Sequence, residues 1–532
     1  MKEVRWDSRK PAARAPAIGR EAVATSHPLA AQAGLAMLRA GGNAVDAALA
    51  AGIALVVLEP VSTGLGGDAF AMVAEPGQAP VVLNGSGRAP MAWTDDRIAA
   101  LDRLPARGWA SVSTPGLVAA WVDLSDRFGT LPFETLFEPA IDWARDGAPL
   151  APGVRGRWQI QVDGLKDQPG FAQAYLPQGA VPQPGMIFRQ PDLAASLEAI
   201  ASTRGRTFYD GPLADEMAEH AARFGGLLSR EDLAAHRSEW MPALSSSPPG
   251  ASWADLHVAP PNAQALVIEL TLAILGHFEA PWSNPDGVEG RHLQIEAFKC
   301  ASADIAAALG DPDGQALTLE ALRDLDHAAR RAAKIQRRAA LSTPGLPGQG
   351  GTVAITAADR DGRMVSFLQS NFVGFGSGVV VPGTGISFHN RLGGFTLDPG
   401  HPNRLAARRR PLHTLMPSLI TSGGQPQAAI GVSGGNMQPQ VQVALALRLL
   451  AAGGEPQTAI DTPRHRHVAG MEINLEAGIQ PHVVAGLAER GHRIAAPVPG
   501  YMDFGSAQML WRLDDAWLAA TDSRKDGAAV AW

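Results

Sequence analysis

The first clear pattern along the chain is helical and runs from residue 28 to residue 58. Apolar side chains recur there every three or four positions, which is the spacing of one helix face. Gly41-Gly42-Asn43 interrupts the run, and Asn43 is a residue type that caps helix N-termini. The following stretch, Ala44–Leu58, is apolar on nearly every side, so we expect a second helix that is fully buried.

Two strand patterns follow this pair of helices. Residues 62–68 form a glycine-dense turn, and the runs Ala69–Val73 and Pro80–Leu83 after it have the composition of strands. The middle third of the chain, from about residue 115 to about residue 335, is mostly helical in pattern. Within it, the segment that starts at Arg323 and ends at Arg338 predicts a basic helix with a solvated face.

The sharpest change of character comes at residues 342–351, which read STPGLPGQGG. Two prolines and four glycines in ten residues predict an exposed, mobile loop without regular structure. A β-type segment, Thr352–Asp359, starts immediately afterwards, Asp361-Gly362 is a hairpin signal, and Met364–Gln369 has the pattern of the return strand. A flexible loop therefore leads directly into a strand whose first residue is a threonine.

Composition narrows the class of protein. The chain has 532 residues, of which 46% are hydrophobic, enough to bury one large core or two cores that share an interface. A net charge of −7 with 18% charged residues argues against a nucleic-acid partner. The single cysteine, Cys300, excludes an intrachain disulfide framework and a cysteine-rich zinc site. No apolar run is long enough to span a bilayer, and the first 30 residues lack a secretory pattern, so we expect a cytoplasmic protein without a membrane partner.

Thr352 is the strongest candidate for chemistry. Its hydroxyl can attack the carbonyl of Gly351, and hydrolysis of the resulting ester would free Thr352 as a new N-terminus. A free α-amine has a pKa of about 7.7–8, so it can act near neutral pH as the general base for the hydroxyl of its own residue. Nucleophile and base then belong to one residue. Threonine is also common in strands for structural reasons alone, so this interpretation needs further support.

Two basic motifs have structural explanations that we prefer to functional ones. Arg464–His467 contains a His-x-His pair but no cysteine or acidic residue, so we expect a surface strand there and no metal site. Arg408–Arg410 lacks the interleaved aromatic residues of a nucleic-acid site, and the chain is acidic overall. The sequence thus predicts no metal and no organic cofactor.

Short motifs along the whole chain resemble the γ-glutamyltranspeptidase family of N-terminal nucleophile hydrolases. Each motif is weak alone, but together they occur in order and at family-like spacing. They are His27–Ala30, Gly41–Ala48, Glu59-Pro60, Gly64–Gly67, Thr114–Gly116, Phe128–Pro132, Thr352 with Asp359 and Asp361-Gly362, Phe375–Gly378, Gly383–Ile386, Arg410–Leu412, Pro417, Gly434-Gly435 and Asp522–Gly527.

The resemblance implies an α+β fold, a four-layer αββα sandwich in which two β-sheets pack face to face between helices. It also implies autocatalytic cleavage between Gly351 and Thr352. The products would be a large subunit, residues 1–351, and a small subunit, residues 352–532, which stay associated. Whether two such heterodimers form a dimer is left open.

The resemblance also assigns catalytic roles. Thr352 matches the family's nucleophile, and Ser370 falls where the family has a second hydroxyl beside it. Gly434-Gly435 matches the family's glycine pair at the oxyanion hole. Adjacent glycine amides can turn toward one point, and no Cβ blocks the approach of a carbonyl.

The chain departs from the family where γ-glutamyl enzymes hold the α-carboxylate and α-amino group of the substrate. In the segment that matches the family's Arg-Glu-x-Ala-Pro, Ser86 takes the arginine's place and Arg88 comes two residues later. Gly393-Gly394 stands in place of paired aspartates, and His413-Thr414 in place of paired serines. A buried charge without a partner costs several kcal/mol, so we expect this site to bind γ-glutamyl groups poorly.

These changes suit an acyl group with an anionic end and no amine. Arg88, Arg391 and His413 are the candidate contacts to its carboxylate, and Asn371 and Thr414 are expected at the same substrate site. The pattern resembles relatives that act as amidohydrolases, such as oxamate amidohydrolase, or as glutaryl-type cephalosporin acylases. We therefore predict hydrolysis of an amide bond in a small, carboxylate-bearing substrate.

Two alternatives stay open. One is a γ-glutamyltransferase or glutathione hydrolase with a rearranged clamp that uses Arg88. The other is an unprocessed protein that binds amides without turning them over. The sequence does not name the physiological substrate, does not distinguish water from an amine as the acceptor, and does not decide which arginine binds the substrate carboxylate.

Overall fold

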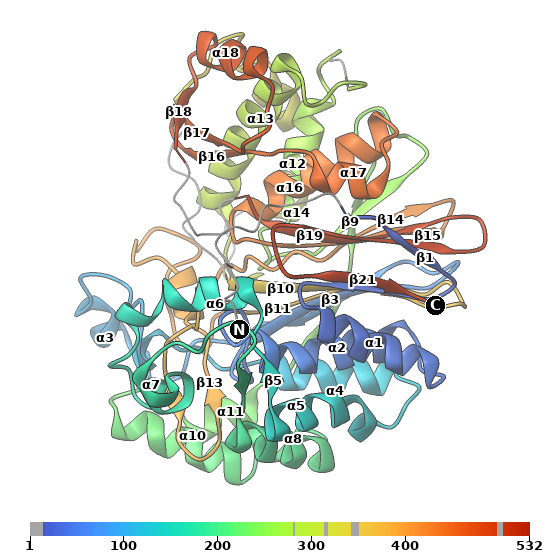
Figure 1. Cartoon of the computed structure of the whole chain (residues 1–532). Helices are drawn as coiled ribbons and strands as arrows, with labels where there is room; N and C mark the ends of the chain where they lie inside the picture. Colours follow the sequence, from blue (N-terminus) through green and yellow to red (C-terminus); the bar gives the residue numbers. More distant parts are fainter. Residues whose placement is uncertain (1–13, 280–281, 313–317, 342–350, 497–503) are drawn as a thin grey trace.

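Two seven-stranded β-sheets lie face to face at the centre of the molecule, and helices cover the outer face of each (Figure 1). The computed structural model describes residues 14–279, 282–312, 318–341, 351–496 and 504–532. The four layers confirm the predicted αββα sandwich. Most of the predicted glycine- and proline-rich loop, residues 342–350, lies outside the described residues.

Each large sheet is a continuous ladder of hydrogen-bonded strands. The first runs in the order β1 (Ala17–Gly19), β20 (Trp517–Thr521), β19 (Ser506–Arg512), β15 (Gln425–Ser433), β14 (Ser418–Ser422), β9 (Asp255–Val258) and β8 (Leu244–Ser246). The second runs in the order β21 (Ala528–Ala531), β2 (Ala22–Thr25), β10 (Gly351–Ala358), β11 (Met364–Phe372), β3 (Asp68–Ala74), β4 (Val81–Gly85) and β7 (Glu239–Pro242).

Three small sheets lie outside this sandwich. They are β5 (Ala148–Pro149) with β6 (Ile187–Phe188), β12 (Val380–Val381) with β13 (Ile386–Ser387), and β16 (His465–Ala469) with β17 (Glu472–Leu475) and β18 (Arg493–Ala495). Among the described residues, no helix combines the length and the apolar character needed to cross a membrane.

The helices form the two outer layers (Figure 1). On the side of the second sheet are α1 (Pro28–Arg39), α2 (Ala44–Leu58), α4 (Leu117–Phe128), α5 (Glu138–Asp146), α8 (Pro191–Thr203), α9 (Arg206–Tyr209), α10 (Pro212–Arg223) and α11 (Arg230–Ala235), with α3 (Asp95–Ala99), α6 (Pro152–Gln159) and α7 (Phe171–Tyr175) beside them. On the side of the first sheet are α12 (Leu266–Leu275), α13 (Val288–Ala308), α14 (Leu319–Leu322), α15 (Leu325–Ala332), α16 (Met437–Ala446), α17 (Pro456–Asp461) and α18 (Pro481–Glu489).

Helix α2 confirms the prediction of a buried helix, since all fifteen of its residues are buried. Asn43 and Asp46 form a capping box at its start, in which each side chain accepts a hydrogen bond from the backbone amide of the other residue. A Cβ at Gly52 would lie 2.7 Å from the ring of Phe367, so a glycine is needed where the helix rests on β11.

The predicted hairpin around Asp361-Gly362 is also confirmed, because β10 and β11 pair antiparallel on either side of it, from the pair of Ala358 with Met364 to the pair of Gly351 with Phe372. Alternate residues of β10 face opposite sides of the sheet. Ala354 and Ala358 belong to the core between the two sheets, whereas Val353, Ile355 and Ala357 pack on the α2 side. Residues in step with Ala354, including the one at position 352, therefore face the other sheet.

The two predicted subunits interleave in both large sheets. The second sheet takes β2, β3, β4 and β7 from before residue 352 and β10, β11 and β21 from after it, and the first sheet is mixed in the same way. A cut before residue 352 would therefore leave two chains that both contribute strands to each large sheet and side chains to the core between the sheets.

Two local predictions were wrong. The basic segment that starts at Arg323 forms a shorter helix than expected, because α15 covers only Leu325–Ala332. The motif Arg464–His467 does not lie on the surface: His465 and His467 are buried, and the guanidinium of Arg464 is bonded inside the protein to the carboxylate of Asp522 at 2.7 Å. An internal ion pair thus stabilises a charge that local sequence pattern placed in solvent.

Candidate active site

Thr352 lies at a β-bulge near the start of β10. Gly351 pairs with Phe372 and Val353 pairs with Gln369, so that two residues of β11, Ser370 and Asn371, stand opposite Thr352. A bulge re-aims side chains and ends regular pairing, and such irregularities are frequent beside active sites. Thr352 is only 1% exposed, and its position in step with Ala354 turns its side chain toward the core between the two sheets.

The hydroxyl of Ser370 connects three groups around this bulge. It accepts hydrogen bonds from the hydroxyl of Thr352 at 3.3 Å and from the amide of Phe372 at 2.8 Å. It donates a short hydrogen bond to the carbonyl oxygen of Gly351. Phe372 has a φ of 72°, a backbone conformation that non-glycine residues rarely adopt, and this turns its amide toward Ser370.

The glycine pair lies in the turn between β15 and α16. Gly434 and Gly435 have φ values of 129° and 56°, which favour glycine. A Cβ at Gly434 would also lie 2.8 Å from the Cα of Gly505. Within the described part of the chain, neither glycine amide donates a hydrogen bond. Two unpartnered amides beside a helix N-terminus form a suitable environment for a negatively charged oxygen.

A buried carboxylate, Asp68, organises the opposite side of the site. Asp68 is the Cα partner of Ser370 across β3 and β11, and its side chain is fully buried. Its Oδ2 accepts from Arg391 Nε at 3.3 Å and from His413 Nε2 at 3.1 Å, and its Oδ1 accepts from the amide of Gly87 at 3.3 Å. Burial alone would raise the pKa of Asp68. His389, whose Nε2 lies 3.4 Å from Oδ1, and then His413 hold that pKa well below the ordinary value, so the carboxylate stays ionised.

Arg391 is the buried cation of this cluster. It begins the 3₁₀ turn Arg391–Gly394, and its guanidinium carbon lies 4.4 Å from the centre of the Phe372 ring. Its Nη1 donates to the hydroxyl of Thr414 at 3.2 Å, whereas its Nη2 is buried and has no hydrogen-bond partner among the described residues. Burial lowers the pKa of Arg391 to about 10, against the opposing effect of Asp68, so it remains charged at neutral pH.

His413 is neutral in this environment. Burial, followed by the charge of Arg391, lowers its pKa to about 3. Its Nε2–H donates to Asp68, and its Nδ1 accepts from the amide of Leu415 at 3.2 Å. Both ring nitrogens are therefore engaged within the protein, which leaves His413 to orient Asp68.

The remaining predicted substrate residues lie in two different places. Asn371 is fully buried beside the bulge, where its Nδ2 donates to the carbonyl of Pro60 at 3.4 Å and its Oδ1 has no described partner. Arg88 lies in a surface cavity, and its side chain is 34% exposed. Its guanidinium forms ion pairs with Glu239 at 3.1 Å and with Asp311 at 3.4 Å. The structure thus brings Thr352, Ser370 and Asn371 together, with the Arg391 cluster beside them, and places Arg88 in separate ion pairs.

Three buried charged residues near the bulge were missed by sequence reasoning. Asp68 is the first residue of β3, a strand in which every residue is buried, and a carboxylate there was a usable signal. Lys525 donates to the carbonyl of Thr352 at 2.8 Å and lies 3.2 Å from Glu59. Lys525 and Glu59 each belong to a motif of the family resemblance, but nothing local in either motif indicates that the two side chains meet.

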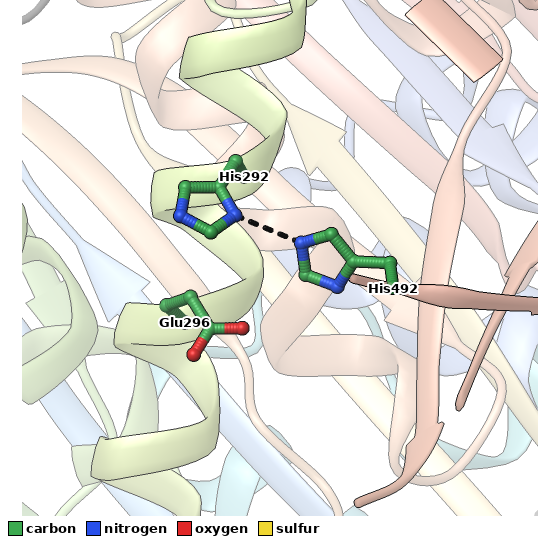
Figure 2. Close-up of side chains that lie close together, drawn as sticks. All are labelled: His292, Glu296 and His492. Atoms are coloured by element: carbon green, nitrogen blue, oxygen red, sulfur yellow. Dashed lines mark hydrogen bonds between the residues drawn. The ribbon is translucent and has the colours of Figure 1, made fainter. Parts of the chain in front are cut away.

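A second cluster, formed by two residues of α13 and the residue before β18, has the residue types of a metal site (Figure 2). One ligand atom from each of His292, Glu296 and His492 lies within 4.8 Å of the others. The Nε2 of His292 lies 2.8 Å from the carbonyl of Gln336 and so carries the hydrogen, which leaves Nδ1 to accept from His492 Nε2 at 2.9 Å.

The carboxylate of this cluster is also engaged. Glu296 accepts from the ammonium of Lys299 at 2.7 Å and from the amide of Ala340 at 3.2 Å. An ammonium bound to the cluster's one carboxylate disfavours a second cation, so hydrogen bonding within the protein explains these residues and we assign no metal to them.

Comparison with known proteins agrees with this geometry. The chain matches the family model described as gamma-glutamyltranspeptidase over residues 30–532. It is 35% identical over 521 residues to the glutathione hydrolase-like YwrD proenzyme of Bacillus subtilis, covering 96% of this chain and 98% of that protein. It is 36% identical over 528 residues to the oxamate amidohydrolase proenzyme of Klebsiella pneumoniae, covering 95% of this chain and 97% of that protein.

A solved structure extends the similarity to the whole fold. The crystal structure of cephalosporin acylase from Bacillus halodurans superimposes with a TM-score of 0.94 at 38% identity, covering 100% of this chain and 99% of that one. Sequence, family model and fold thus agree from end to end. The chain belongs to the γ-glutamyltranspeptidase family of N-terminal nucleophile hydrolases and is an enzyme of its amidohydrolase and acylase branch.

Proposed function

We propose that the protein cuts itself between Gly351 and Thr352 and then hydrolyses an amide bond in a small substrate that carries a carboxylate. The observation that carries this proposal is the position of the Ser370 hydroxyl, which is bonded both to the carbonyl of Gly351 and to the hydroxyl of Thr352. The nucleophile and the bond that it would attack therefore share one partner.

In the maturation step, Thr352 Oγ1 bonds to the carbonyl carbon of Gly351 and the bond from that carbon to the nitrogen of Thr352 breaks. The nitrogen takes the hydroxyl proton, and water hydrolyses the ester. Gly351 leaves as a carboxylate, and Thr352 keeps a free α-amine and its hydroxyl. Ser370 already donates to the oxygen that becomes negative, which lowers the barrier to the attack.

In turnover, the α-amine of Thr352 removes the proton from Oγ1 as the hydroxyl attacks the substrate's amide carbonyl. The amides of Gly434 and Gly435 receive the oxyanion, and the support for this role is that neither has another acceptor in the described chain. The leaving amine takes the proton. Water then attacks the acyl ester with the α-amine as its base, the acyl group leaves as a carboxylic acid, and Thr352 Oγ1 regains its proton.

Arg391 is our choice for the substrate's carboxylate. Its Nη2 is buried without a described partner, so a carboxylate oxygen there would satisfy a donor that otherwise costs free energy. Asp68 balances the charge of Arg391, and Thr414 holds its other terminal nitrogen. Arg88 remains the alternative, but two carboxylates already pair with it.

Hydrolysis of a γ-glutamyl compound is the second candidate, because one relative is named a glutathione hydrolase-like proenzyme. A γ-glutamyl group brings an ammonium beside its carboxylate and needs an acidic partner. Asp68, the carboxylate in contact with Arg391, already accepts from three donors. We therefore place a carboxylate-bearing acyl group without an amine, as in oxamate or a glutaryl amide, ahead of it.

The proposal is tested on a denaturing gel and by assay. The 55.6 kDa chain should give bands of about 37 and about 19 kDa, in proportion to 351 and 181 residues, and N-terminal sequencing of the smaller band should begin Thr-Val-Ala-Ile. Thr352→Ala should remain one band. The mature protein is then assayed with oxamate, a glutaryl anilide and a γ-glutamyl anilide. A wild-type chain that stays uncut and inactive under all conditions would reject the proposal and favour a protein that only binds amides, and turnover of the γ-glutamyl compound alone would reject the substrate class.

A further inference from the structure

A buried ion pair lies directly against Thr352. The ammonium of Lys525 donates to the carbonyl oxygen of Thr352 at 2.8 Å and lies 3.2 Å from Oε2 of Glu59. Both charged side chains are completely buried. The mechanism proposed above uses neither of them, although burying an ion pair is expensive unless its geometry and hydrogen bonds offset the lost hydration.

Several elements surround this pair. Glu59 caps the C-terminus of α2, and its Oε2 also accepts from Arg157 of α6 at 3.1 Å and from the hydroxyl of Ser62 at 3.2 Å. The Oε1 of Glu59 has no hydrogen-bond partner among the described residues. The charges on this side of Thr352 are therefore fixed by residues from both ends of the chain.

The other titratable groups that face the pair are His27, Asp526 and Arg14. Burial lowers the pKa of His27, the residue that caps α1, so it is neutral. Asp526 accepts from the amide of Val154 at 3.1 Å, and Arg14 donates to the carbonyl of Lys525 at 3.0 Å. The charged groups in direct contact with Glu59 are the cations Lys525 and Arg157, so two positive charges surround this one carboxylate beside Thr352.

The charge states of the pair follow from this packing. Burial alone would raise the pKa of Glu59, but the charges of Lys525 and Arg157 more than offset it and hold that pKa at about 2. Burial lowers the pKa of Lys525 to about 8, with Glu59 opposing the change. At neutral pH the carboxylate is ionised and the amine of Lys525 is mostly protonated.

We propose that Lys525 and Glu59 are positioning residues that set the working pH of the Thr352 amine, an inference that rests on the proposed function. Lys525 holds the carbonyl of Thr352 in place, and its positive charge keeps the α-amine released by cleavage in its neutral, basic form. Glu59 has the opposite effect and limits the influence of Lys525.

The distances are short enough for this effect. The nitrogen and the carbonyl oxygen of one residue lie within about 3.6 Å, so the Lys525 ammonium lies within about 6.5 Å of the α-amine. A like charge at that separation in a buried site disfavours a second proton by an amount of the order of one pH unit. The amine would otherwise be largely protonated below its ordinary pKa of about 7.7–8 and could not act as a base there.

The test measures the amine in the mature protein in two ways. One is the acidic limb of the pH profile of kcat/KM on whichever panel substrate is turned over. The other is the pH dependence of acetylation of the Thr352 amine by acetic anhydride, read from the mass of the tryptic peptide 352–360, which contains no lysine. Lys525→Met should move the acidic limb of kcat/KM and the midpoint of acetylation upward by about one pH unit, and Glu59→Gln should move the limb and the midpoint downward. Lys525→Arg, which keeps the charge, should restore the wild-type position.

The chain offers a matched control. Lys299 is also a buried lysine that pairs with a carboxylate, Glu296, and donates to a backbone carbonyl, that of Ala340. Lys299→Met should lose comparable stability and leave both pH profiles unchanged. Equal shifts in the Lys299 and Lys525 variants would mean a general effect of destabilisation and would overturn the proposal.

The two proposals fail separately. An uncut or inactive wild-type chain contradicts the proposed function itself. A cut and active wild type whose pH profiles do not move in Lys525→Met and Glu59→Gln, or move in the same direction in both, contradicts only the role of the pair. If neither variant matures, the wild-type amine decides: acetylation with a midpoint at or above about 7.7–8 overturns the proposal, and a lower midpoint supports it.

Discussion

Asp68 and Ser370 are Cα partners across strands β3 and β11, and both side chains lie on the face of the sheet that meets the other sheet. One strand therefore carries the hydroxyl that contacts Thr352, and its neighbour carries the carboxylate that holds Arg391. Neighbouring strands are about 4.8 Å apart, so the two proposed roles, chemistry at Thr352 and recognition of a substrate anion by Arg391, would rest on one rigid element.

Replacement of Ser370 by alanine should slow both self-cleavage and turnover. The variant loses the donor to the Gly351 carbonyl and the partner of the Thr352 hydroxyl, and the loss of one such donor typically lowers a rate by about 10²–10³-fold. Time courses of band formation after in vitro translation measure the first effect, and kcat measures the second. Ser366→Ala is the matched control, since Ser366 is buried on the same face of β11 and donates to the carbonyl of Ile430. Wild-type rates in the Ser370 variant would remove it from the mechanism.

Replacement of Arg391 by methionine should lower kcat/KM for anionic substrates by about 10–100-fold. This is the worth of one hydrogen bond between charged groups, about 1.5–3 kcal/mol. Activity on a neutral amide should fall much less. Arg88→Met is the comparison, because the sequence left both arginines as candidates, and Arg88 is already paired with Glu239 and Asp311. If only the Arg88 variant loses activity on the anion, the carboxylate binds in the surface cavity.

Replacement of Asp68 by asparagine should destabilise the protein at neutral pH by about 3–5 kcal/mol, because it leaves the buried guanidinium of Arg391 without its charge partner. The pKa of Asp68 is depressed in the folded state, so its contribution to stability is complete above its ordinary value of 3.8 and is lost as the pH falls toward the folded-state pKa. The difference in unfolding free energy between wild type and variant should therefore be large at pH 7 and smaller at pH 3.

Asp359→Asn is the control for this pH dependence. Asp359 is a buried carboxylate whose pKa is raised by burial. It therefore ionises more easily in the unfolded chain, and raising the pH lowers its contribution to the stability of the fold. The cost of Asp359→Asn should not grow between pH 3 and pH 7. Urea unfolding at both pH values measures the two variants side by side, and a parallel response of both would contradict the assignment of Asp68.

Replacement of Gly434 by alanine should lower kcat with little change in KM. The residue has a φ of 129°, and a Cβ there would lie 2.8 Å from the Cα of Gly505, so the turn that presents the two amides must shift. Gly453→Ala is the control, since Gly453 also has a positive φ but no atom lies within 4 Å of its added Cβ. Steady-state kinetics of both variants decide, and an unchanged kcat for Gly434→Ala would place the oxyanion elsewhere.

The sequence was sufficient wherever a structure depends on neighbours along the chain. The buried helix α2 follows from an apolar run with a capping Asn43, and the hairpin of β10 and β11 follows from Asp361-Gly362 between two β-type runs. The placement of Thr352 at the start of a strand, directly after a glycine- and proline-rich segment, was visible in the same way. Periodicity and turn chemistry are local properties, so the linear order of residues is enough to predict them.

The charged surroundings of Thr352 depend on residues that are far apart in the chain. Asp68 meets His413 across 345 positions, and Lys525 meets Glu59 across 466. The same packing leaves Arg391 buried and pairs Arg88 at the surface, although the sequence presented both as equal candidates. Which charges become buried, and which opposite charge each one meets, is set only when distant strands and loops pack together. Local pattern carries no information about that, because the free energy of a buried charge depends on its three-dimensional neighbours.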